Sequence, residues 1–173
     1  MESSTKKETL KKDISCLNEL KEKYEVLRQK YSLPDFNDLN KVFDIEELDS
    51  ESDFLIRKIR RFMSEKLAGY MRFIEILLNP SNAPIYFFKL IKKLDEIDRE
   101  TLNLMYESLG KIEVETISLD LSYNEEKEVD FIKKLYRVYN DEIRIKLLEV
   151  LKRLGNGEGE KKKDLNGDGS YFG

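Results

Sequence analysis

Residues 53–79 read DFLIRKIRRFMSEKLAGYMRFIEILLN, and this stretch decides the fold class. Its apolar residues recur at steps of three or four, which is the spacing of one face of an α-helix. They are Leu55, Ile56, Ile59, Phe62, Met63, Leu67, Tyr70, Phe73, Ile74, Leu77 and Leu78. Because this face is wide, it predicts a helix that is covered by several neighbours. Ser52 or Asp53 is expected to cap its start, and Asn79-Pro80 ends it.

The segment 5–31 carries a narrower apolar stripe. Its members are Leu10, Ile14, Leu17, Leu20, Tyr24, Leu27 and Tyr31. Such a stripe is close to a coiled-coil seam, so this first helix is expected to be the least covered and can project as a coiled-coil arm. Cys16 lies beside the stripe, and we expect a half-buried structural thiol there.

Three more helices are predicted downstream: a short one near 82–94, one from about 98 to 121, and a last one over 124–154. The inner face expected for the last helix holds Phe131, Ile132, Leu135, Val138, Tyr139, Ile143, Ile145, Leu148 and Leu151. Residues 111–121 also alternate apolar and polar side chains, so a strand with a bulge is the alternative. We favour a helix, because a lone strand has no partner in this chain.

The sequence therefore predicts an all-α fold, a bundle of four long helices plus one short helix. We expect three parts: an N-terminal amphipathic helix (1–34), a helical bundle (35–155) that opens with an acidic connector (35–53), and a flexible tail (156–173). The tail is rich in Gly, Lys and Asp, a composition typical of segments that bury little apolar surface.

The amino-acid composition limits the kinds of reaction that the protein is expected to catalyse. The 173 residues include no histidine, one cysteine and 38% charged residues, with a net charge of −4. Most proton-shuttling and nucleophilic chemistry uses His or Cys, so we expect a non-enzymatic protein with no cofactor. With no signal-like or membrane-spanning run in the sequence, we expect a cytoplasmic location and no membrane partner.

Two acidic pairs are the nearest approach to a catalytic set. Glu22-x-x-Glu25 and Glu46-x-x-Asp49 repeat the ExxE and ExxD spacing with which carboxylates hold Mg²⁺ against a nucleotide phosphate. This spacing resembles that of the all-helical nucleotide pyrophosphohydrolases, which implies Mg²⁺-dependent hydrolysis as an alternative function. The likeness stops at these four positions, and Asp49 begins a stretch that reads as a helix cap.

A basic stretch supports a second alternative. Arg57, Lys58, Arg60 and Arg61 lie together and could contact the phosphates of RNA or DNA, as in a ribosome-associated factor. The acidic connector immediately upstream is expected to neutralise part of this charge.

The tail holds two further candidates. Asp164, Asn166 and Asp168 have the spacing of the first half of an EF-hand loop, which predicts at most weak calcium binding. Tyr171 and Phe172 follow this polar segment, an arrangement typical of short motifs that dock on a partner protein.

Two phrases carry a resemblance. Residues 32–62, SLPDFNDLNKVFDIEELDSESDFLIRKIRRF, and residues 77–88, LLNPSNAPIYFF, resemble uncharacterised all-helical proteins encoded in archaeal genomes. The resemblance implies a microbial, cytoplasmic source and no particular activity. The function expected from the residues is therefore an interaction or assembly protein that binds another protein or a second copy of itself.

Overall fold

The computed structural model describes residues 2–49 and 54–155, with side chains from residue 15 onward except that of Asn82. All regular structure in this part of the chain is helical, so the all-α prediction is confirmed. The α-helices are α1 (Glu2–Tyr31), α2 (Phe36–Phe43), α3 (Leu55–Leu78), α4 (Ile85–Ile91), α5 (Glu96–Leu121), α6 (Glu125–Val138) and α7 (Ile145–Gly155). Short 3-10 turns cover Ile45–Glu47 and Pro80–Asn82, and a π-helical turn, Tyr139–Arg144, joins α6 to α7.

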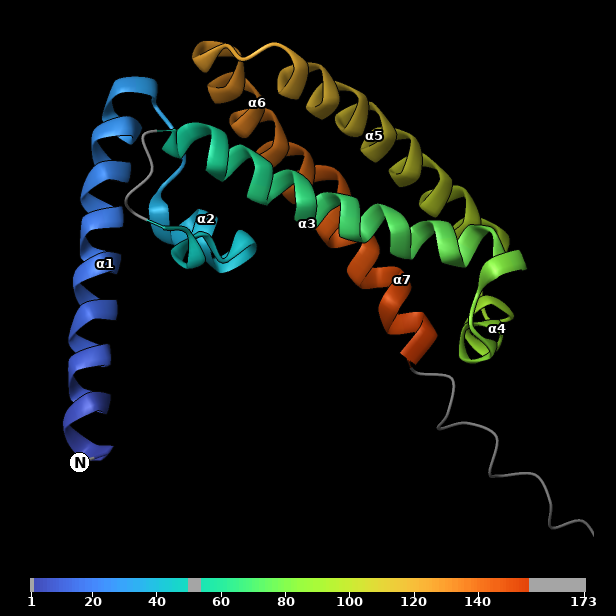
Figure 1. The fold of residues 1–173 in the computed structure, drawn as a ribbon. Coiled ribbons are helices and arrows are strands. Elements are labelled where there is room, and N and C mark those ends of the chain that lie inside the picture. Colours follow the sequence, from blue (N-terminus) through green and yellow to red (C-terminus); the bar gives the residue numbers. More distant parts are fainter. Residues whose placement is uncertain (1, 50–53, 156–173) are drawn as a thin grey trace, which may run out of the picture.

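Helix α3 is the centre of the fold, as its wide apolar face predicts. It packs against both α5 and α6, and Figure 1 shows it crossing the segment formed by α6 and α7. Phe54 precedes α3, and its side chain makes no capping hydrogen bond to the helix. The predicted caps Ser52 and Asp53 lie outside the described residues. The helix ends before Asn79, whose N–H donates to the Glu75 carbonyl at 2.8 Å.

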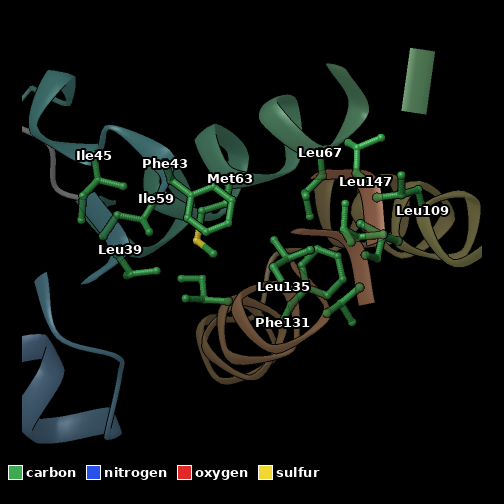
Figure 2. Close-up of a cluster of buried hydrophobic side chains, with 14 of the residues drawn as sticks. Leu39, Phe43, Ile45, Ile59, Met63, Leu67, Leu109, Phe131, Leu135 and Leu147 are labelled. Atoms are coloured by element: carbon green, nitrogen blue, oxygen red, sulfur yellow. The ribbon is translucent and has the colours of Figure 1, made fainter. Parts of the chain in front are cut away.

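The core brings together side chains from distant parts of the sequence. Figure 2 shows Met63 and Leu67 of α3 with Phe131 and Leu135 of α6 in this core. Leu39 and Phe43 of α2 extend it at one end, and both are fully buried. Because interiors of this kind are close-packed, each of these contacts fixes the position of one helix against another.

The acidic connector is part of this core. Asp35 caps α2 by accepting a hydrogen bond from the N–H of Asn37 at 2.8 Å, and Asp44 ends the helix in a left-handed conformation, with φ of 55°. The described part of the connector thus forms short helical segments. Phe36 and Ile45 point inward and are buried, so the acids of the connector occupy the outer face.

Helix α1 runs along one side of the molecule, and its N-terminal half extends beyond α2 (Figure 1). Its second half is anchored by Leu20 and Tyr24, which are buried. The Tyr24 hydroxyl donates to the Pro34 carbonyl at 2.7 Å, and burial raises the pKa of this phenol. Cys16 is exposed, so the half-buried thiol expected there is wrong: it lies on the outer side of the helix.

Residues 111–121 form the last turns of α5, and the helical interpretation is confirmed over the strand. The reason is visible in the burial pattern. Leu109, Ile112 and Leu119 face inward at helical spacing, while Val114 and Ile117 are exposed. The apparent alternation arose from apolar residues on the solvent side.

The last helix is interrupted by the π-helical turn. Val138 and Ile143 are consecutive inward positions, five residues apart, where an α-helix would use three or four. The extra residue is accommodated in the turn, where the Asn140 side-chain amide donates to the Tyr136 carbonyl at 2.9 Å. The helix predicted over 124–154 is therefore present, and it carries a π turn at its middle.

This turn changes which residues of α7 are buried. Leu147, Val150 and Leu154 face the core. Ile145, Leu148 and Leu151 were expected on the inner face, but they are 59%, 48% and 38% exposed. The π turn brings Ile143, Leu147, Val150 and Leu154 into one inward stripe at steps of three and four, and the three exposed residues lie outside this stripe.

Candidate functional site

The predicted basic stretch begins with a guanidinium that is completely buried. Arg60 of α3 is 0% exposed and donates from Nε to Glu128 at 2.6 Å. Its Nη2 donates to Asp120 at 2.7 Å and to Glu128 at 3.2 Å. One arginine thus joins α3 to the end of α5 and the start of α6.

The other basic residues of the stretch also have partners. Arg61 donates to the Asp120 carboxylate at 2.9 and 3.0 Å. Arg57 donates to the Asp120 carbonyl at 3.2 Å and lies over the Tyr123 ring. Lys58 lies 3.9 Å from Asp49. The structure therefore places these four cations among acidic or carbonyl partners, and the free basic face that nucleic-acid binding requires does not form from them.

Most of the carboxylates that neutralise the basic residues of α3 were not indicated by the sequence. The acidic connector supplies Asp49 for Lys58 and Asp44 for Lys66, at 2.6 Å. Asp120 and Glu128, which hold the three arginines, lie 59 to 68 residues away in sequence. Only the tertiary packing of α3 against α5 and α6 reveals them.

This network shifts the pKa values of Arg60 and Asp120. Burial alone would lower the pKa of Arg60, but the hydrogen bonds to Glu128 and Asp120 outweigh it and raise that pKa. The hydrogen bond from Arg60 holds the pKa of the Asp120 carboxyl below its ordinary value. Because the folded-state pKa of Asp120 is depressed, its contribution to stability is present above the unfolded pKa of about 4 and is lost as the pH falls through the folded value.

We therefore expect Asp120→Asn to destabilise the protein at neutral pH and to have little effect in acid. The difference between the unfolding free energies of the wild type and Asp120→Asn should shrink as the pH falls from about 6 to below about 3. Urea unfolding across this range measures it, with the exposed Asp130→Asn as the matched control. A difference that stays constant with pH would contradict the assignment.

A polar hollow of about 530 Å³ adjoins the network between α3 and α5. Three arginines and three carboxylates line it, so it has no net charge to attract an anion. The lining residues are Arg60, Arg61, Ser64, Glu65, Ala68, Arg72, Glu113, Thr116 and Asp120. Arg60 Nη1 is buried here without a hydrogen-bond partner among the described residues, while its other nitrogens hold the helices together.

The four candidate carboxylates do not form a metal site. Glu25 accepts two hydrogen bonds from Arg28, at 2.7 and 2.9 Å, and Glu46 accepts one from Asn40 at 2.9 Å. Asp49 faces Lys58, and Glu22 is exposed. Within the described ranges, no three acidic or cysteine side chains converge in a way that could hold a metal ion. The ExxE and ExxD spacing thus reflects separate solvent-facing positions.

The tail candidates cannot be placed. Asp164, Asn166, Asp168, Tyr171 and Phe172 lie outside the described residues, so the calcium and docking predictions remain predictions.

A different candidate site lies beside the π turn. The exposed apolar residues of α7 line a hollow of about 330 Å³ between α7 and α3. Its lining residues are Tyr70, Tyr139, Ile143, Arg144, Leu147, Leu148 and Leu151. Most of this lining is apolar, and Leu148 and Leu151 lie beside the buried stripe of α7.

A second hollow, of about 280 Å³, lies beside α2. It shares Tyr139 and Arg144 with the apolar hollow, and its other lining residues are Asp38, Lys41, Val42, Tyr136 and Asn140. We call the two together the junction groove. The first hollow forms its apolar end on α7, and the second hollow forms its polar end beside α2.

Tyr139 separates the two ends and is held firmly. Its ring lies 5.3 Å from that of Phe43 and 6.1 Å from that of Tyr70, with which it stacks. Burial, together with Tyr139, raises the pKa of Tyr70 to about 12, so this phenol is neutral near pH 7. The groove therefore has a preformed aromatic wall, as binding sites commonly do.

Sequence reasoning missed the junction groove, although a signal was present. An unbroken helix continued from Val138 would turn Glu142, Lys146 and Arg153 toward the core. If the turn after Val138 contains one additional residue, Ile143, Leu147 and Val150 face inward instead. This change of phase in the apolar pattern is what a π turn produces.

Among the described helices, none combines the length and the apolar character needed to cross a bilayer. No protein-family model, curated protein or solved structure matches the chain.

Proposed function

We propose that the protein is a non-enzymatic interaction protein that binds another protein through the junction groove. The observation that carries this proposal is the exposure of Leu148 and Leu151 beside a hollow with a preformed aromatic wall. Apolar side chains that line a hollow and remain uncovered are typical of binding surfaces. The nucleic-acid and pyrophosphohydrolase alternatives lack such support, because their candidate residues are engaged in internal contacts or lie apart.

In this proposal the helices have separate roles. Helices α3, α5, α6 and α7 act as a bundle that holds the groove in a fixed shape, and α1 is an arm attached through Tyr24. A rigid groove lowers the entropic cost of binding, because fewer side chains have to be ordered when the partner arrives.

The test uses the double variant Leu148→Asp/Leu151→Asp. Both side chains are exposed, so we expect the free energy of unfolding to change by no more than about 1 kcal/mol. Two charges in an apolar contact should abolish partner binding, because they would be buried without a counter-charge. Affinity purification from the native host, followed by mass spectrometry, compares the variant with the wild type.

Val114→Asp is the matched control, because Val114 is an exposed apolar residue of α5 that does not line the groove. We expect the same nuclease-resistant partner with the wild type and with this control, and its loss from the double variant. Retention of the partner by the double variant, or its loss on nuclease treatment, would contradict the proposal.

A further inference from the structure

The second half of α5 carries apolar side chains on two opposite sides. Its inward side packs against α3. On the opposite side, Val114, Ile117 and Leu121 are 69%, 53% and 83% exposed. Together with Gly110 they recur at steps of four, three and four residues, which is the spacing of a coiled-coil seam. We call these four residues the outer stripe of α5.

The exposed apolar surface continues beyond the end of this helix. Tyr123 lies two residues after Leu121, and its ring is 5.8 Å from that of Phe54, in an edge-on arrangement. Phe54 and Tyr123 line a hollow of about 280 Å³ together with Val26 of α1, and all three side chains are exposed.

The area of this surface suits a dimer. The three exposed residues of the outer stripe, with Tyr123, Phe54 and Val26, expose on the order of 600 Å², which is at the upper end of the patches found on monomeric proteins. Each partner of a standard protein interface contributes about 800 Å². The apolar side chains alone therefore supply most of the area that a stable dimer needs.

We propose that the outer stripe of α5 is a dimer interface, in which α5 packs antiparallel against α5 of a second copy of this chain. The spacing of the stripe is the same in both directions, so a two-fold axis between Val114 and Ile117 places each stripe on the other. Val114 then lies against Ile117 of the second copy, and Gly110 lies against Leu121. This proposal is independent of the junction groove, whose lining contains no residue of α5.

Gly110 is the observation that selects a second copy as the occupant. A Cβ at this position would meet nothing within 4 Å, so packing within the chain does not require a glycine here. Glycine inside a helix lowers the stability of that helix relative to alanine. In the antiparallel pair, the missing side chain leaves room for Leu121 of the second copy, the most exposed residue of the stripe.

The charged residues beside the stripe are compatible with this arrangement. On the flank that faces α3, Glu113 of each copy approaches Asp120 of the other. The half-exposed Arg61, which donates to Asp120, lies at the same place and supplies the counter-charge. On the other flank, Lys111 faces the uncharged Ser118.

Sedimentation velocity of the full chain over a range of concentrations tests the dimer. We expect the wild type to shift from a monomer of 20.5 kDa to twice that mass as the concentration rises. Ile117→Asp/Leu121→Asp should raise the dissociation constant at least about tenfold, because the dimer would bury four charges without counter-charges. Both positions are exposed, so circular dichroism should show that this variant keeps its helices. Leu148→Asp/Leu151→Asp is the matched control, with the same charges placed in the junction groove, and should dimerise like the wild type.

Cysteine pairs test the antiparallel register. In a Cys16→Ser background, Gly110→Cys/Leu121→Cys should form a disulfide-linked dimer under oxidising conditions. Neither single variant should do so, because identical positions lie about 16 Å apart along the two helices, beyond the reach of a disulfide.

Four results would overturn the dimer. They are a wild type that stays monomeric at every concentration, an Ile117→Asp/Leu121→Asp variant that dimerises as tightly as the wild type, loss of the dimer in the groove variant, and a cross-link from either single cysteine. Loss of the native partner from the groove variant is a separate result, so the proposed function and the dimer can fail independently.

Discussion

Replacing Arg60 with methionine is expected to lower the free energy of unfolding by about 3–5 kcal/mol, the largest effect of any substitution in the charge network. Glu128 is fully buried, and two hydrogen bonds from Arg60 offset the cost of burying its charge. Without the guanidinium, that carboxylate stays in the interior without a counter-charge. Urea unfolding at neutral pH measures the loss.

The double variant Arg60→Met/Glu128→Leu separates this cause from a packing defect. Replacing both buried charges with apolar side chains of similar size is often neutral or stabilising, so we expect it to recover most of the stability. Asp120 keeps Arg57 and Arg61 as neighbours in this variant. If the double variant were as unstable as Arg60→Met alone, the buried-charge explanation would be wrong.

The second large effect is a contrast between two deletions. Removing Asp141, an exposed residue of the π turn, shortens the step from Val138 to Ile143 from five residues to four. Four is an ordinary α-helical step, so Leu147 and Val150 keep their inward positions. We expect a cooperative fold that loses no more than about 2 kcal/mol.

Removing the exposed Glu107 from α5 should have the opposite outcome. That helix has no extra residue to absorb the loss, so the deletion rotates Leu109 and Ile112 by about 100° away from the core. We expect the cooperative thermal transition to disappear, which circular dichroism would detect. Equal tolerance of the two deletions, or loss of the fold in both, would show that the π turn does not carry the additional residue.

The helices were largely predictable from the sequence, because each carries an apolar stripe of helical period. The wide stripe of α3 indicated its central place, and the narrow stripe of α1 indicated the partial burial of that helix, which Leu20 and Tyr24 anchor. Phe36, Leu39 and Phe43 of the acidic connector also recur at helical spacing, and all three are buried in α2. These features depend on local spacing alone.

The sites were not predictable in the same way. The basic stretch of α3 looked like a candidate nucleic-acid surface because its counter-charges, Asp120 and Glu128, are distant in sequence. Leu148 and Leu151, which line the junction groove, were expected on the inner face of the last helix, whereas the π turn places Leu147 and Val150 there. The first difference arises from how helices pack against each other, which the sequence pattern of one helix does not contain. The second follows from a change of phase within one helix, which the apolar pattern does contain.

The central claim is that a partner protein occupies the junction groove, and site-specific photo-crosslinking in the native host tests it most directly. A photoreactive amino acid is placed at Leu148 in one version of the chain and at Val114 in the other, because both side chains are exposed and only Leu148 lines the groove. We predict one discrete adduct from Leu148, cross-linked to another protein, and no such adduct from Val114. The same adducts from both positions, or none from Leu148, would contradict the account.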